Sequence, residues 1–173
     1  MKTIALFFAV LLLLSPSSTA LAQDKSDLEA IHELIDRYAQ TEDAGDLVAQ
    51  AALMTADRVW IGQAGAGRRT DQAKNLERQQ ARFDATAALA PGIRWFTEAR
   101  DRMVKFYGDG TVAVASFYWY RAFVLPGDLP LEVLDLFRTP TVPEVMTQVL
   151  VKEGGEWKIA HTHVSLLYPP AGQ

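Results

Sequence analysis

The sequence predicts an α+β domain in which a cone-like, curved mixed or antiparallel sheet wraps around N-terminal helices and leaves an apolar pocket. Helical spacing of apolar residues dominates up to position 90, whereas strand-forming residues dominate from Ile93 onward. Helices followed by an antiparallel sheet is the order typical of α+β domains. Apolar residues make up 49% of the chain, enough for a substantial core.

The first 22 residues have the pattern of a secretory signal peptide. Lys2 provides a positive charge, residues 4–14 are an unbroken apolar run, and "ALA" at 20–22 fits the small-x-small cleavage pattern. The run is too short to cross a bilayer stably, which takes about 20 residues. We expect cleavage near Ala22, a periplasmic or secreted protein, and one domain over residues 23–173 without stable membrane insertion. An uncleaved anchor is the alternative.

Composition excludes several classes of function. The chain has no Cys, so disulfides and thiol nucleophiles are excluded. Its formal charge is -4, and the basic residues are scattered rather than gathered in a stripe. Nucleic acid and anionic lipid are therefore poor candidate partners.

Residues 26–46 follow the pattern of an amphipathic helix. Ser26 can serve as the N-cap, and Glu29, three residues on, completes a capping box. Gly45 marks the break after the helix. The apolar residues fall on one face and predict a buried stripe, which contains Leu28, Ile31, Leu34, Ile35 and Tyr38.

Three further elements are expected before the sheet. "LVAQAALM" at 47–54 reads as a short helix, and "DRVWIG" at 57–62 as a short strand. After a loop, Thr70 can cap a helix over 71–89, which ends before Pro91.

The second half is strand-rich. Residues 93–107 form one long strand or two short ones, and residues 111–124 a long strand that is apolar on both faces, so both faces should be covered. Such a strand suits dimerisation through the sheet. Residues 145–167 predict a hairpin with its turn at 153–155. Residues 125–144 are too long for a hairpin loop, and a short helix there would have one apolar face, formed by Leu131, Leu134 and Phe137.

Two stretches resemble known families. "GEWKIAHTHVS" (155–165) resembles the last strand of the SnoaL-like branch of the nuclear transport factor 2-like superfamily, and the hairpin is similar to that of the association domain of calcium/calmodulin-dependent kinase. "RYAQTEDAGDL" (37–47) is similar to the first-helix segment of ketosteroid isomerase. The resemblance covers most of 27–168. It implies the fold but not one activity, because this fold hosts isomerases, dehydratases, hydrolases, cyclases and binding proteins.

The resemblance also implies where active residues would lie. The isomerase tyrosine falls on Tyr38. The isomerase base carboxylate and the kinase domain's pocket glutamate both fall on Gly62, and the second isomerase carboxylate falls on Thr147 or Gln148. The kinase domain's pocket arginines fall on Gln148 and Val164. The departures argue against ketosteroid isomerisation and against that domain's way of holding carboxylate ligands.

Two of the three histidines lie one residue apart in the last strand. Strict alternation puts His161 and His163 on one side with Trp157, Ile159 and Ser165, and Ala160, Thr162 and Val164 on the other. The family comparison makes the second side the pocket side. The histidines then face helices or a subunit interface. A metal site would need a third ligand that no spacing identifies, so no metal is predicted, and a catalytic role for the pair is the remaining alternative.

We expect the pocket to bind a small hydrophobic molecule. Its predicted contacts are Tyr38, Trp60, Gln148, Thr162 and Val164. Further aromatic residues add to the case for a flat or apolar ligand, namely Trp95, Tyr118 and Tyr120. Any inward-pointing arginine would be an anion or carbonyl anchor, with four candidates: Arg94, Arg100, Arg102 and Arg121.

The resulting prediction is an exported, homodimeric binding domain without a cofactor. The alternative is a metal-independent lyase or isomerase. In that case the Tyr38 phenol would polarise a carbonyl, while His161, His163 or a water molecule moved the proton.

Overall fold

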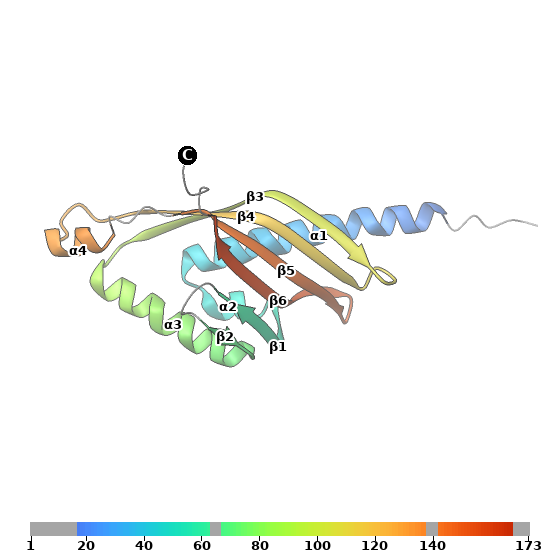
Figure 1. Ribbon diagram of the computed structural model, residues 1–173, viewed down its shortest axis with the longest axis horizontal. Coiled ribbons are helices and arrows are strands. Elements are labelled where there is room, and N and C mark those ends of the chain that lie inside the picture. The colour runs from blue at the N-terminus through green and yellow to red at the C-terminus, as the bar shows by residue number, and fades with distance from the viewer. Residues whose placement is uncertain (1–16, 63–66, 138–141, 168–173) are drawn as a thin grey trace, which may run out of the picture.

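The computed structural model describes residues 17–62, 67–137 and 142–167 (Figure 1). The described helices are α1 (Ser17–Ala44), α2 (Leu47–Ala51), α3 (Gln72–Leu89) and α4 (Leu131–Leu136). The described strands are β1 (Met54–Ile61), β2 (Arg68–Arg69), β3 (Arg94–Tyr107), β4 (Val112–Val124), β5 (Glu144–Glu153) and β6 (Glu156–Leu166).

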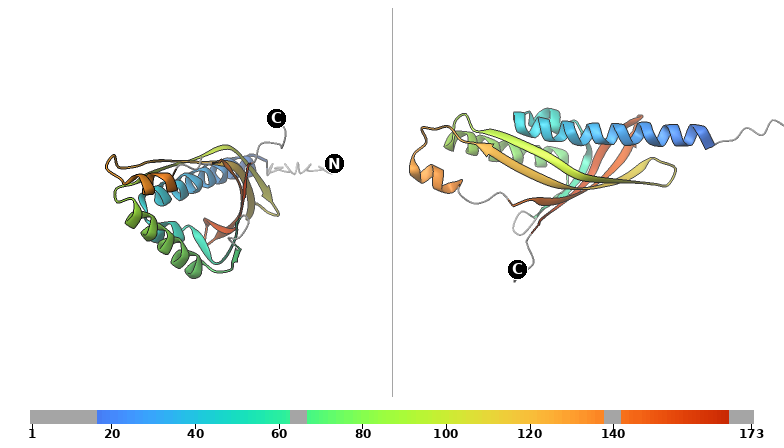
Figure 2. Two further views of the ribbon diagram at one scale, coloured as in Figure 1. Left: turned by 60° about the vertical axis from the view of Figure 1, so that its left-hand side comes forward. Right: turned by 90° about the horizontal axis from the view of Figure 1, so that it is seen from above.

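The strands form one sheet in the order β2-β1-β6-β5-β4-β3. β1 and β6 are parallel, and the other neighbouring pairs are antiparallel. The sheet is open and curves around α1, with α2 and α3 on the same side (Figure 2). The predicted α+β class, with helices first and a curved mixed sheet, is confirmed.

The core lies between α1 and the concave face of the sheet. The predicted stripe of α1 is buried at Ile31, Leu34, Ile35 and Tyr38. Every second residue of β4 points inward and is buried, from Ala113 to Trp119, whereas the residues between them are half-buried. Within this chain only one face of β4 is covered, so the expectation that both faces are covered is not met by the described elements.

Three predicted boundaries are wrong. α1 begins nine residues before Ser26, because the preceding Ala, Leu and Gln residues are strong helix formers, and Ser26 lies inside the helix. The helix spans the expected cleavage site, so cleavage stays a prediction. α3 is capped by Asp71, not Thr70: Asp71 Oδ1 accepts from Lys74 N at 2.6 Å. α2 stops at Ala51, because Met54 begins β1.

β3 is a single 14-residue strand with a bulge between Arg100 and Met103. Asp101 at the bulge has φ 52°, a left-handed conformation that an Asp side chain tolerates. The sequence left open one long strand or two short ones, and the structure shows one long strand that the bulge interrupts.

A second bulge, in β6, corrects the predicted strand faces. Val149 pairs with His161, but the next residue of β5, Leu150, pairs with Ile159, which leaves Ala160 as an extra residue. The extra residue reverses the alternation. The inner face therefore holds Trp157 and Ile159 together with Thr162 and Val164, all buried. His161 and His163 point to the opposite, outer face, as expected, but Trp157 and Ile159 do not lie with them.

α4 is the short helix expected between β4 and β5, and it lies at the end of the molecule where β4 ends (Figure 1). Phe137, its C-cap residue, packs edge-on against Phe123 of β4, with ring centres 5.4 Å apart. Among the described residues, no helix combines the length and apolar character needed to cross a bilayer.

Candidate functional site

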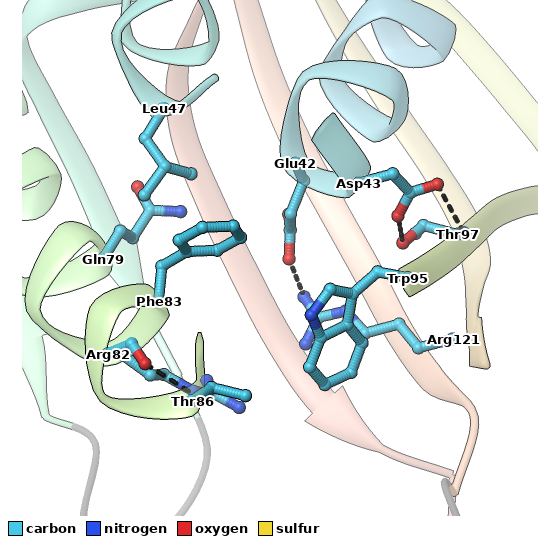
Figure 3. Close-up of a pocket in the computed structure, with 10 residues that line it drawn as sticks. All are labelled: Glu42, Asp43, Leu47, Gln79, Arg82, Phe83, Thr86, Trp95, Thr97 and Arg121. Carbon is cyan, nitrogen blue, oxygen red and sulfur yellow. Dashed lines mark hydrogen bonds and ion pairs between the residues drawn. The ribbon is translucent and has the colours of Figure 1, made fainter. Parts of the chain in front are cut away.

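A cleft of about 100 Å³ lies between α3 and the ends of α1, β3 and β4 (Figure 3). Its lining combines aromatic, charged and amide side chains. They are Glu42, Asp43, Leu47, Gln79, Arg82, Phe83, Thr86, Trp95, Thr97 and Arg121.

Two aromatic side chains face each other across the cleft. Phe83 comes from α3 and Trp95 from β3, as Figure 3 shows. Trp95 is held edge-on by Phe123, with ring centres 5.3 Å apart, and Phe123 is in turn held by Phe137. Phe83 lies over Gly45, where a Cβ atom would come within 2.2 Å of its ring. Both walls are therefore fixed by packing from behind.

The polar floor of the cleft is an ion pair between α1 and β4. Arg121 Nη2 lies 2.8 Å from Glu42 Oε1, and Arg121 Nη1 lies 3.7 Å from Glu144 Oε2. Gln50 Nε2 donates to the second oxygen of Glu42 at 3.1 Å. Burial lowers the pKa of Arg121, but the carboxylates of Glu42 and Glu144 outweigh it and raise the pKa overall. The guanidinium therefore stays charged.

Asp43 joins the end of α1 to β3. Its Oδ2 accepts from the backbone N of Thr97 at 2.8 Å, and its Oδ1 accepts from the Thr97 hydroxyl. Two bonds to one residue fix the carboxylate at the rim of the cleft and leave it with unused lone pairs. Glu42 and Asp43 thus place two carboxylates beside the aromatic walls.

α3 is attached to the rest of the molecule by a chain of hydrogen bonds. Gln79 Nε2 donates to Gln50 Oε1 at 2.9 Å, Asn75 Nδ2 to Gln79 Oε1 at 2.6 Å, and Arg69 Nη1 to Asn75 Oδ1 at 3.2 Å. Asn75 is the one buried residue among the described residues of α3. The Arg69 guanidinium also lies 4.2 Å from the centre of a Trp60 ring. The helix that forms one wall is thus held mainly by polar contacts.

The five predicted ligand contacts lie elsewhere and do not line the cleft, whereas Trp95, one of the further aromatic residues expected at the pocket, does line it. Tyr38, Gln148, Thr162 and Val164 are buried in the core, and Trp60 is half-buried against it. Burial raises the pKa of Tyr38 although the charge of Arg58 opposes this, so the phenol is neutral. Their roles as ligand contacts stay predictions.

The two histidines lie apart from both the cleft and the buried residues around Tyr38. His161 and His163 lie on the outer face of β6, opposite Val149 and Thr147. Burial, and then the neighbouring His163 and Arg58, lower the pKa of His161. In the part of the chain that the structure describes, no three His, Asp or Glu side chains cluster as they would around a metal ion.

Of the four candidate arginines, Arg121 lines the cleft. Arg94 and Arg100 are exposed, and Arg102 pairs with Asp36 of α1. The arginine that the sequence argument missed is Arg58, which is 1% exposed. Strand alternation could have identified it, because Arg58 stands two residues before Trp60 on the same strand and must share its face.

The sequence has no match among known family profiles, nor among curated proteins. Solved structures do match. A nuclear transport factor 2-like protein with a cystatin-like fold from Novosphingobium aromaticivorans is 18% identical, with a TM-score of 0.67, over 92% of this chain and 94% of that one. ActVI-ORFA from Streptomyces coelicolor is 18% identical, with a TM-score of 0.65, over 82% and 97%.

A third similar structure, also from Novosphingobium aromaticivorans, is named as a candidate aromatic ring hydroxylase. It is 19% identical, with a TM-score of 0.63, over 84% of this chain and 92% of that one. At such identities these likenesses show the fold. The protein has the nuclear transport factor 2-like fold that its last strand led us to expect.

Proposed function

We propose that the protein binds a small, flat, mainly hydrophobic molecule that carries one polar group, and that it does so in the cleft between α3 and the sheet. The observation that carries the proposal is the pair of aromatic walls, Phe83 and Trp95, over the ion-paired floor of Glu42 and Arg121. Stacking on the two rings would hold the body of the ligand. Hydrogen bonds from the floor would orient its polar group.

Titration calorimetry with 2-naphthol as the probe tests this proposal, since naphthol is flat and carries one hydroxyl group. We expect wild-type protein to bind it and Trp95→Ala to weaken binding at least tenfold. Tyr107→Ala is the matched control, because Tyr107 is an exposed aromatic of the same strand, at its far end. Equal affinity in wild type and Trp95→Ala would overturn the proposal. Native mass spectrometry of the freshly purified protein adds the mass of any molecule that copurifies.

The alternative function is a metal-independent lyase or isomerase. The specific observation in its favour is that Glu42 and Asp43 place two carboxylates at an aromatic-walled cleft, where a carboxylate can act as a general base. Among the similar structures, the one named as a candidate aromatic ring hydroxylase also has an enzyme's name. The histidines point away from this cleft, so a proton acceptor at the cleft would be a carboxylate.

Exchange of the α-protons of 2-indanone in D2O, followed by NMR, tests the enzymatic alternative. The alternative is supported if wild type exchanges the protons faster than buffer does and the rate falls to that of buffer in Glu42→Gln, in Asp43→Asn or in both. Exchange at the buffer rate in wild type counts against it. Gln keeps the shape of Glu42, so retained naphthol binding in Glu42→Gln would separate loss of the base from loss of the cleft.

Export and dimerisation complete the proposal. The signal-peptide pattern of residues 1–22 motivates export, and intact mass of protein from a periplasmic fraction tests it: the mass expected for residues 23–173 supports cleavage near Ala22. The half-exposed apolar outer face of the sheet motivates a homodimer.

A further inference from the structure

Arg58 is a buried charge held by weak partners. The side chain extends from β1 into the core and is 1% exposed. Its Nη2 donates to Thr162 Oγ1 at 2.9 Å, and its Nη1 lies 2.7 Å from Met54 Sδ. A thioether is a weak acceptor, far poorer than a carboxylate oxygen. One of the two terminal nitrogens of this guanidinium is therefore satisfied only poorly.

No negative charge compensates this guanidinium within residues 17–62, 67–137 and 142–167. None of the ion pairs there involves Arg58, and its Nε has no hydrogen-bond partner among them. Its aromatic neighbour is Tyr38, whose ring centre lies 6.0 Å from the guanidinium carbon. The Tyr38 phenol is a hydrogen-bond partner of Arg58, but it is neutral and brings no compensating charge. Burying an unpaired charge is strongly unfavourable, so interior arginines are ordinarily paired.

A second unsatisfied group lies in the same part of the inner face. Gln148 is 0% exposed and stands directly opposite Thr162 in the β5–β6 register. Its Oε1 has no partner among the described residues, and its Nε2 reaches only Met146 Sδ, at 3.7 Å. Two methionine sulfurs thus occupy the positions where the Nη1 donor of Arg58 and the Nε2 donor of Gln148 would each bind an oxygen acceptor more strongly.

We propose that Arg58, with Tyr38, Thr162 and Gln148, forms an interior site for the carboxylate of a small organic acid. One guanidinium and three neutral groups compensate a single negative charge, which suits a carboxylate and leaves a phosphate dianion uncompensated. Unbranched methionine side chains move readily, so Met54 and Met146 can give way to the ligand. Their apolar stems and the Tyr38 ring would surround its tail.

This site is distinct from the cleft. The Tyr38 ring packs edge-on against Trp119, at 5.6 Å, and the Arg121 guanidinium of the cleft floor lies 5.9 Å from the Trp119 ring. Trp119, which is fully buried, therefore contacts both Tyr38 and the cleft floor. Binding of a carboxylate at Arg58 does not require a ligand in the cleft.

Binding of phenylacetate and of phenylacetamide, which match in shape and differ in charge, tests the site on the full chain. Calorimetry and thermal unfolding at constant ionic strength should show phenylacetate binding at least tenfold more tightly than the amide. In Arg58→Met this preference should fall to about one, and Arg58→Lys should keep part of it. Trp95→Ala, which removes a cleft wall, should keep all of it.

Gln148→Glu provides an independent test, because it places a carboxylate beside Thr162 within the chain itself. We expect the ligand-free variant to melt at a higher temperature than wild type and to lose phenylacetate binding. The proposal is overturned if wild type shows no preference for the acid, if Arg58→Met keeps the preference, or if Gln148→Glu binds phenylacetate as wild type does. If Arg58→Met does not fold, the phenylacetate binding and melting temperature of Gln148→Glu still test the proposal.

Discussion

Gly62, the position on which the resemblance places the isomerase base, has no room for a side chain. A Cβ atom at Gly62 would lie 1.9 Å from Cη2 of the Trp60 indole, which folds back over the backbone of its own strand. An acidic side chain there would have to displace the indole. The absence of a carboxylate at position 62 therefore goes together with the position of the Trp60 indole.

Gly62→Ala should therefore destabilise the protein by about 1–3 kcal/mol, the usual cost of overpacking. In a Trp60→Ala background the same change should cost almost nothing, because the obstacle is gone. Denaturant unfolding of the four proteins of this double-mutant cycle measures the difference. Gly127→Ala is the control, since nothing lies within 4 Å of its Cβ position. Equal costs in both backgrounds would contradict the steric account.

His161 should make stability depend on pH. Its pKa is lowered in the folded state, chiefly by burial, below the ordinary 6.5. The unfolded chain then binds more protons below about pH 6.5, so stability is fully present above that pH and is lost as the pH falls toward the folded pKa. Melting temperatures at pH 7.5 and 5.5 should differ less in His161→Gln than in wild type. An identical difference in the two proteins would contradict this assignment.

Single residues were predictable where a pattern pointed at them. The stripe of α1, including Tyr38, follows from helical spacing, and it is buried as expected from Ile31 onward, while Leu28 is half-buried. Phe83 and Glu42 could not be identified as cleft residues, because each belongs to a helix pattern that reads equally well as a solvated face. Their role depends on α3 and α1 meeting across the cleft, which is a tertiary contact that local spacing does not encode.

At the scale of elements, the end of α1 and the middle of α3 determine each other. Gly45 ends α1 with φ 70°, a conformation that favours glycine, and the Phe83 ring of α3 fills the space where a side chain would be. A residue other than glycine would be strained and would also push the cleft wall outward.

Gly45→Ala should thus cost more than backbone strain alone. Gly108 is the matched control: it has φ 64°, but nothing lies within 4 Å of its Cβ position. Gly108→Ala should cost about 1–2 kcal/mol through strain, and Gly45→Ala about 1–3 kcal/mol more through overpacking. Chemical denaturation measures both free energies. Equal costs would show that Phe83 does not depend on Gly45 for its position.

The elements themselves were more predictable than their details. The existence and order of the helices and strands followed from periodicity, except for the two-residue strand β2, which lies in the stretch expected to be a loop. The bulge at Ala160 was missed because strict alternation was assumed along "WKIAHTHV". The apolar residues change phase between Ile159 and Val164, and the pairing of β6 with β5 shows that one residue is extra. That single residue decides that Trp157 and Thr162 share a face, and hence which residues surround Arg58.

At the scale of the whole molecule, helices α1, α2 and α3 lie on one side of the sheet and leave its outer face uncovered (Figure 2). The register places Val59, His161, Val149 and Val114 in one row across β1, β6, β5 and β4. The next row of β4 and β5 pairs Val112 with Val151. These side chains are half-buried, and a contiguous apolar surface of this kind is typical of protein interfaces.

If two copies pair through this face, a charge at its centre should separate them. Val149→Lys puts a lysine between Val114 and His161, and in a symmetric dimer two such lysines would approach each other across the interface. We expect wild-type protein to sediment as a dimer at micromolar concentration and Val149→Lys as a folded monomer. Val48→Lys, on α2 at 69% exposure, is the matched control and should stay dimeric. A wild-type monomer, or a dimer that survives Val149→Lys, would contradict pairing through the sheet.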